Sequence, residues 1–127
     1  MRKTLFLTLI LCLCFSYKFS QSITVDSPTK GENWKLGTLK KIIWTTTSTT
    51  GKFKITLWLD GDQLGVIAKD IDPDKRTKLW EVGKLLLPLK IRPADLFQIK
   101  VKEQGTSTAG FSAIFKITMK VEENYQQ

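Results

Sequence analysis

Histidine is absent from the 127-residue chain, and this absence excludes several kinds of chemistry. Ser-His-Asp and Cys-His catalysis, zinc sites with imidazole ligands and pH switches centred on imidazole all require this side chain. Cysteine is scarce as well, because the sequence has only Cys12 and Cys14. The remaining composition, 42% hydrophobic and 25% charged, is that of one globular domain and excludes wholesale disorder.

The amino-terminal segment has the pattern of a cleavable export signal. Residues 2–3 are basic, and residues 5–15 form an apolar run with a single interruption. This run is too short to span a bilayer, which takes about 20 apolar residues. Small residues follow it, and they allow cleavage after Ser16 or after Ser22. We favour Ser22, because Ile23 begins a strand-like run; the alternative for the whole segment is a buried amino-terminal helix.

Removal of this signal peptide changes the charge and the thiol content of the chain. Arg2, Lys3 and Lys18 leave with it while all 12 acidic residues stay, so the formal net charge falls from +8 to +5. Both cysteines leave too, so the mature protein is expected to have no disulfide and no thiol nucleophile. A chain of about 105 residues buries roughly 65% of its unfolded surface and folds on its core alone. No second long apolar run follows, so we expect a secreted, extracellular product with no membrane insertion after cleavage.

Alternation of apolar and polar residues is the main pattern of the mature chain. A period of two is typical of strands with one face toward a core and the other toward solvent. Strand candidates, bounded by Gly, Pro and Asp turn sequences, are 23–25, 39–46, 52–59, 63–68, 78–82, 97–103 and 111–120. The apolar stretch 85–91 is broken by Pro88 and followed by Pro93, so we expect it to cross between sheets.

About seven short strands within roughly 100 residues predict an all-β fold, an Ig-like antiparallel β-sandwich. Asp60-Gly61 lies between two alternating runs and indicates a hairpin. The Thr-rich stretch 45–50 is interpreted as a polar loop between strands, with O-linked sugar as the alternative. The predicted organisation is a signal peptide over 1–22, a β-sandwich domain over 23–120 and a polar tail over 121–127.

Part of this pattern resembles a known family. Residues 28–37 read Pro-x-x-Gly-x-x-Trp-x-x-Gly, an Ile-x-Trp piece follows at 42–44, and further matches lie at 54–57, 80–82 and 112–117. These pieces are similar to the KRE/KNH-like domain, the Ig-like amino-terminal module of fungal cell-wall synthesis proteins and Ser/Thr-rich GPI-anchored proteins. The resemblance implies an Ig-like fold and a polysaccharide-rich wall or matrix as the setting. It supplies no catalytic residue.

Two features depart from the family pattern. Phe97 stands where relatives tend to have a Tyr entering the penultimate strand, so no tyrosine corner is expected there. The Ser/Thr-rich stalk and the anchor signal of the family have no counterpart in this sequence. We therefore expect a free-standing module and not a wall-linked one.

A lysine-rich sheet face is the main candidate binding site. In an Ig-like order, the strands at 52–59, 97–103 and 111–120 are neighbours. Their outward residues are Lys52, Lys54, Trp58, Lys100, Lys102, Lys116 and Lys120. Six ammonium groups and an indole on one face suit an anionic surface or a polysaccharide. The alternative is a solvated face on which Lys prevents aggregation between sheet edges.

The tryptophans divide into core candidates and one candidate for ligand contact. Trp34 is expected to close one end of the sandwich, and Trp80 shares the inward phase of Val82. Trp58 is out of phase with the apolar residues of its own run, so we expect it on the outer face. The candidate ligand-binding residues are Trp58, Lys54, Lys100, Lys102 and Lys116.

Metal and catalytic sites receive little support from the sequence. The run 70–74, with Glu81 at the twelfth place, imitates part of a calcium loop, but Lys75 replaces the required Gly and a strand follows. The remaining carboxylates form no pair in an evident pocket. We predict no catalytic residue, no metal site and no cofactor. Nucleic acid is not an expected partner, because the protein is exported and poor in Arg.

The sequence thus predicts a secreted, non-catalytic Ig-like module with a binding or structural role at the cell surface, cell wall or extracellular matrix. Polysaccharide or another anionic surface is the expected contact. The alternative is a secreted protein-binding domain, of adhesion or inhibitor type, that acts through its end loops.

Overall fold

The computed structural model describes residues 21–48, 50–84 and 91–119. Most of the predicted signal peptide and the predicted tail 121–127 lie outside these ranges, as does the greater part of the predicted crossover. Among the described residues no helix is long and apolar enough to cross a membrane. The strands are β1 (Ile23–Ser27), β2 (Asn33–Lys35), β3 (Leu39–Thr46), β4 (Phe53–Leu59), β5 (Asp62–Ile71), β6 (Thr77–Glu81), β7 (Phe97–Glu103), β8 (Ala109–Phe111) and β9 (Lys116–Thr118).

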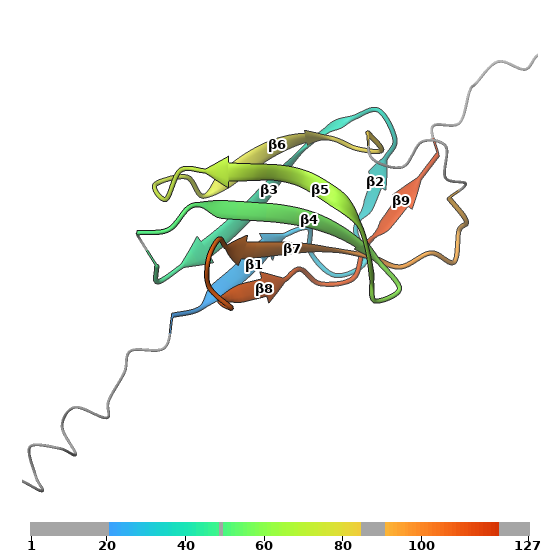
Figure 1. The fold of residues 1–127 in the computed structure, drawn as a ribbon. Helices are drawn as coiled ribbons and strands as arrows, with labels where there is room; N and C mark the ends of the chain where they lie inside the picture. Colours follow the sequence, from blue (N-terminus) through green and yellow to red (C-terminus); the bar gives the residue numbers. More distant parts are fainter. Residues whose placement is uncertain (1–20, 49, 85–90, 120–127) are drawn as a thin grey trace, which may run out of the picture.

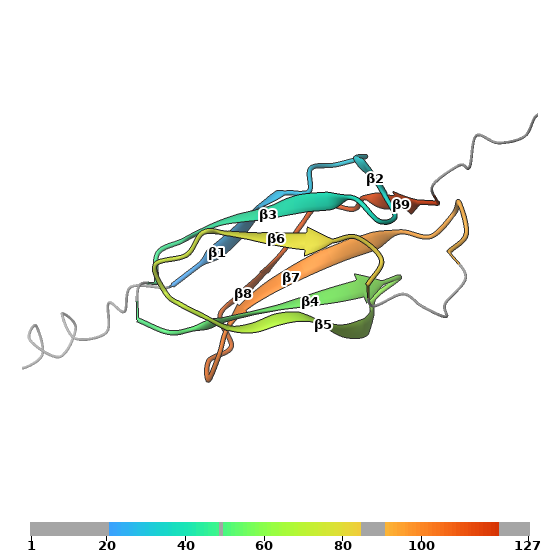
Figure 2. The same ribbon diagram turned by 90° about the horizontal axis from the view of Figure 1, so that it is seen from above.

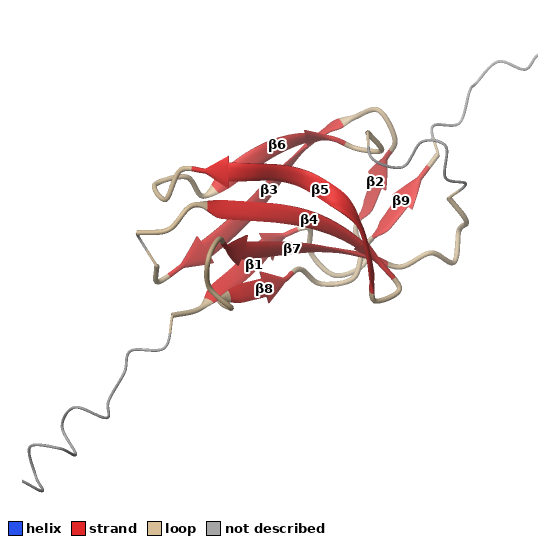
Figure 3. Ribbon diagram, viewed as in Figure 1, coloured by secondary structure: helices blue, strands red, loops and turns tan. Residues whose placement is uncertain are grey.

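The described strands form an Ig-like β-sandwich, as the alternation predicts (Figure 1). One sheet has the order β1-β3-β6 and the other β5-β4-β7-β8, and all pairs within them are antiparallel. The two sheets lie face to face when the molecule is seen from above (Figure 2). Strand and loop account for all the described residues, with no helix among them (Figure 3).

The prediction of one continuous strand over 111–120 is wrong. The structure divides it into β8, which pairs with β7, and β9, which pairs in parallel with the unpredicted β2. The break has a local cause at Ser112, whose Oγ accepts a hydrogen bond from the Ile99 N–H at 2.9 Å and donates one to the Ala113 carbonyl. A side chain thus takes over one of the bonds at the edge of β7 and interrupts the regular ladder. Backbone pairing resumes once, at Phe115, which bridges Phe97 before the chain turns to β2.

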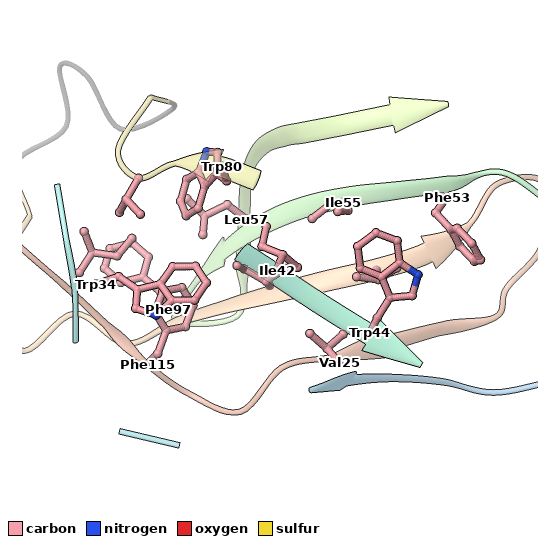
Figure 4. Packing of buried hydrophobic residues seen from close by; sticks show 14 of the residues in the cluster. Val25, Trp34, Ile42, Trp44, Phe53, Ile55, Leu57, Trp80, Phe97 and Phe115 are labelled. Atoms are coloured by element: carbon pink, nitrogen blue, oxygen red, sulfur yellow. The ribbon is translucent and has the colours of Figure 1, made fainter. Parts of the chain in front are cut away.

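Inward residues of both sheets form one apolar core, and its aromatic members gather in two groups (Figure 4). Near one end, the Trp34 ring lies 5.0 Å from Phe115 and 6.3 Å from Trp80, measured between centroids. Toward the other end, Trp44 meets Phe53 edge-on at 5.8 Å. Trp34 and Trp80 are only 1% and 4% exposed, which confirms their predicted inward positions.

One side of the sandwich is closed by β1 and β8, which belong to different sheets. Gly110 of β8 lies so close to β1 that a Cβ atom there would overlap the carbonyl oxygen of Ile23. Two backbones can approach in this way only where a side chain is missing. Gly110 therefore allows the two sheets to meet along this side.

Substitution Gly110→Ala is expected to destabilise the protein by about 2 kcal/mol, because the new methyl group meets rigid backbone. Urea unfolding followed by tryptophan fluorescence measures the change. Ala109→Gly, in the same strand, is the matched control and should cost less than about 1 kcal/mol. Equal midpoints for Gly110→Ala and the unmodified protein would contradict this account of the closure.

Glu32 fixes the turn between β1 and β2. Its Oε2 accepts hydrogen bonds from the backbone N–H and the hydroxyl of Thr29, and its Oε1 accepts one from the Trp34 indole at 3.3 Å. The backbone hydrogen bond from Thr29 is the main reason that the pKa of Glu32 lies below its ordinary value of 4.5. The ionised carboxylate therefore stabilises the folded state, and this contribution is lost as the pH falls through the lowered pKa.

Substitution Glu32→Gln should reduce stability at neutral pH, and the reduction should shrink as the pH falls below the ordinary pKa of 4.5, because the unfolded state then takes up a proton before the folded state does. Urea unfolding at several pH values between 3 and 7 gives both curves. Glu81→Gln, which removes one carboxylate from β6, controls for the change in net charge. A constant difference between Glu32→Gln and the unmodified protein across this range would refute the assigned role.

Candidate functional site

The outer surface of β4, β7 and β8 carries most of the predicted binding residues. Ile55, Leu57, Ile99 and Val101 are fully buried in the core, so the residues between them in β4 and β7 point outward. Across the pair, Lys54 lies opposite Lys102, Thr56 opposite Lys100, and Trp58 opposite Gln98. We call the surface formed by Lys54, Thr56, Trp58, Lys100, Lys102 and Phe111 the lysine face.

A shallow hollow of about 330 Å³ lies on the lysine face. Its lining consists of Lys54, Thr56, Gln63, Lys100, Lys102, Gln104 and Gly105. All three lysines are partly exposed. Among the described residues the one ion pair within 4.0 Å joins Arg92 to Asp95, so no described carboxylate neutralises these ammonium groups at that distance. The hollow thus presents cationic and neutral polar donors to solvent.

An aromatic pair adjoins the hollow. Trp58 and Phe111 meet edge to face with ring centroids 5.3 Å apart, and Phe111 is 46% exposed. The Lys100 Nζ lies 5.2 Å from the Trp58 ring and 5.4 Å from the Phe111 ring, within the range of a cation–π interaction. The Trp58 indole N–H donates to the Thr56 hydroxyl at 2.8 Å, which fixes the ring on the sheet. Trp58 therefore lies on the outer face, as its phase predicts, and is half-buried against Phe111.

The predicted grouping of six lysines on one sheet face is wrong. Lys116 belongs to β9, which pairs with β2 and not with β7, so it does not join the lysine face. Lys52 precedes β4 and is exposed, but it does not line the hollow. Lys120 lies outside the described residues. The last backbone contact with β7 is the Phe115–Phe97 bridge, and at Lys116 the chain turns to β2, where the Lys116 N–H donates to the Glu32 carbonyl.

Phe111 is the member of the lysine face that the sequence analysis missed. Continuous alternation through 111–120 gives Phe111 the same phase as the buried Phe115. The structure instead pairs Phe111 with Lys100, on the outer face. The phase changes at Ser112, whose hydroxyl accepts a hydrogen bond from the N–H of Ile99, a residue distant in sequence. No local signal in the sequence reports that bond.

The stretch that imitates a calcium loop has another structural role. The Asp70 Oδ1 accepts a hydrogen bond from Gln104 Nε2 at 3.0 Å, and the Asp70 N–H donates to Gln104 Oε1. These bonds join the end of β5 to the β7–β8 turn. In the part of the chain that the structure describes, no group of three or more acidic, Cys or His side chains is placed to hold a metal ion.

The Thr-rich stretch is anchored by its buried residue, Ser48. Thr45 and Thr46 end β3, and the Ser48 hydroxyl donates to Glu103 Oε1 at 2.8 Å. Ser48 and Glu103 are both buried. The β3–β4 connection is therefore tied to the carboxyl end of β7, beside the turn that begins at Gln104. The O-linked sugar considered for this stretch stays a prediction.

Comparison with known proteins gives matches among solved structures. No family model and no curated protein matches the chain. Among solved structures, it is similar to the fibronectin(III)-like modules of Clostridium thermocellum CbhA, with 13% sequence identity and a TM-score of 0.45 over 76% of this chain and 96% of that one. No residue role is transferred at this level of similarity. The KRE/KNH-like resemblance stays a prediction.

Substitution Lys54→Glu is expected to stabilise the protein, because it replaces the like-charge pair with Lys102 by an opposite-charge pair. Cross-strand pairs contribute about 0.2–1 kcal/mol, and the gain should shrink as salt screens it. Thermal unfolding at about 20 mM and about 500 mM NaCl, the latter shortening the screening length to a few ångströms, measures both effects. Lys84→Glu, with the same change in net charge but outside the lysine face, is the control. A loss of stability in Lys54→Glu at low salt would contradict the assigned repulsion.

Proposed function

We propose that this protein is a secreted, non-catalytic Ig-like module that binds polysaccharide at the cell surface, cell wall or extracellular matrix through its lysine face. The observation that carries the proposal is the pair of exposed Phe111 and half-buried Trp58 beside a hollow lined with hydrogen-bond donors. Aromatic rings provide large apolar contact area for the C–H faces of sugar rings. The lysine ammonium groups and the Gln63 amide around the hollow provide partners for sugar hydroxyls.

The chemistry of the lining supports binding without catalysis. Glycoside cleavage generally uses two carboxyl groups on either side of the scissile bond. The hollow is lined instead by Lys, Gln, Thr and Gly, and none of these residue types supplies the required acid and base pair. A sugar chain on this face would be held and not cut.

The start of the first strand supports secretion. β1 begins at Ile23, immediately after the favoured cleavage position at Ser22. Cleavage there would leave the whole of β1 in the mature chain. Sequencing the amino terminus of protein recovered from the medium of cells that express the full chain tests this part of the proposal.

Protein binding through end loops is the second candidate function. The β3–β4 and β7–β8 connections lie side by side, because the Gln104 N–H donates to the Lys52 carbonyl at 2.8 Å and Ser48 bonds Glu103. Two adjacent loops at one end of a sandwich make a surface for a protein partner. This candidate predicts that substitutions in the loops abolish binding while those on the lysine face do not.

Affinity electrophoresis in gels that contain a neutral polysaccharide tests the proposed function. Trp58→Ala and Phe111→Ala should each raise the dissociation constant obtained from the retardation about tenfold. The estimate takes the contribution of an aromatic ring that stacks on a nucleic-acid base in an open site, about 1–3 kcal/mol, as a guide to a ring that stacks on a sugar. Leu79→Ala removes a large exposed side chain from the opposite sheet and is the matched control. Unfolding midpoints establish that each variant is folded. Unchanged retardation of both aromatic variants would overturn the proposed face.

A further inference from the structure

We propose that the hollow between Lys54, Lys100 and Lys102 is a subsite for a tetrahedral oxyanion ester, a sulfate or phosphate group carried by the polysaccharide. This inference rests on the proposed function, because it names the class of polysaccharide that the lysine face takes. It is carried by the charges around the hollow, by their position in the sheet and by the neighbouring aromatic pair.

The charge arrangement is unfavourable in the free protein. Lys54 and Lys102 are direct cross-strand partners, and Lys100 shares their face one pair further along. Like charges placed directly opposite each other destabilise a sheet. No described carboxylate lies within 4.0 Å of any of the three lysines. A bound anion would remove this repulsion, so the arrangement is suited to the complex and not to the free state.

The position of these lysines excludes protection of a sheet edge as their role. Lysine on an edge strand blocks pairing with another sheet. In the order β5-β4-β7-β8, however, β4 and β7 are the two inner strands. Their backbone groups already pair on both sides, so Lys54, Lys100 and Lys102 have no open edge to protect.

The groups around the hollow suit a tetrahedral anion. Sulfate and phosphate oxygens accept hydrogen bonds from lysine ammonium groups, each of which is a compact point charge with three rotatable donors. The hollow combines three ammonium groups with the Gln63 amide and contains no Arg, while the Gln104 amide at its rim is already bonded to Asp70. Its volume of about 330 Å³ accommodates one ester group together with several waters, since each water occupies about 30 Å³ in the liquid.

Lys100 joins the hollow to the aromatic pair. It lines the hollow, and its Nζ also lies within 5.4 Å of the ring centroids of Trp58 and Phe111. A single esterified sugar unit can therefore place its acid group in the hollow and its ring beside the indole. This juxtaposition favours an acidic polysaccharide over a free anion, which would use the lysines alone.

Titration calorimetry with four polymers on one backbone tests the subsite: dextran, dextran sulfate, dextran phosphate and carboxymethyl dextran, the last three matched in charge density. The purified protein is expected to bind the sulfate or the phosphate polymer at least tenfold more tightly than the carboxymethyl polymer. Added salt should weaken this preference. Sulfate and phosphate are distinguished by which of the two polymers binds more tightly.

Lys54→Gln and Lys102→Gln should each lower the affinity for the preferred ester polymer about tenfold and leave binding to dextran unchanged. Lys52→Gln, next to the same strand but outside the hollow, is the matched control. Equal affinities for all three acidic polymers, or normal affinity in both hollow variants, would overturn the subsite while the proposed function stands. Failure of every polymer to bind would overturn the proposed function itself. Tighter binding of a single-stranded oligonucleotide than of any dextran ester would overturn the assignment to polysaccharide.

Discussion

The antiparallel pairing of β4 with β7 is the interaction on which the core and the lysine face both depend. Seven consecutive cross-strand pairs join the two strands, from Phe53–Glu103 to Leu59–Phe97. Because side chains alternate between the faces, the same register places Ile55 and Val101 in the core and Lys54 and Lys102 outside. A shift by one residue would exchange the two sets. The core therefore fixes which groups meet on the outer surface.

The core face of the β4–β7 pair contributes more free energy than the repulsion between lysines on its outer face costs. Burial of one large apolar side chain stabilises the fold by about 1.5–3 kcal/mol, and β4 alone has Phe53, Ile55 and Leu57 fully buried. A like-charge cross-strand pair costs about 0.2–1 kcal/mol. The core thus holds the register with a wide margin over the lysine repulsion.

The sequence was sufficient for the sandwich and for much of the lysine face, because both follow from a period of two within single strands. The inward phase of Ile55 and Ile99 and the outward phase of Trp58 require no knowledge of the rest of the chain. The positions of Lys116 and Phe111 could not be predicted without knowledge of the rest of the chain. Their positions depend on a hydrogen bond between Ser112 and Ile99 and on the parallel pairing of β9 with β2. Both are contacts between residues far apart in the sequence. They interrupt the strand, although the alternation of apolar and polar residues continues to residue 120.

The central claim is that ligand binds on the outer surface of the β4–β7 pair. The most direct test is a titration of isotope-labelled protein with a sulfated or phosphorylated dextran oligosaccharide, followed through the chemical shifts of backbone amides and the tryptophan indole N–H groups. The account predicts that the largest changes fall on Lys54, Lys100, Lys102 and the Trp58 indole, and that Trp34, in the core, changes little. Changes confined to the β3–β4 and β7–β8 connections, or to the outer face of β3 and β6, would contradict it.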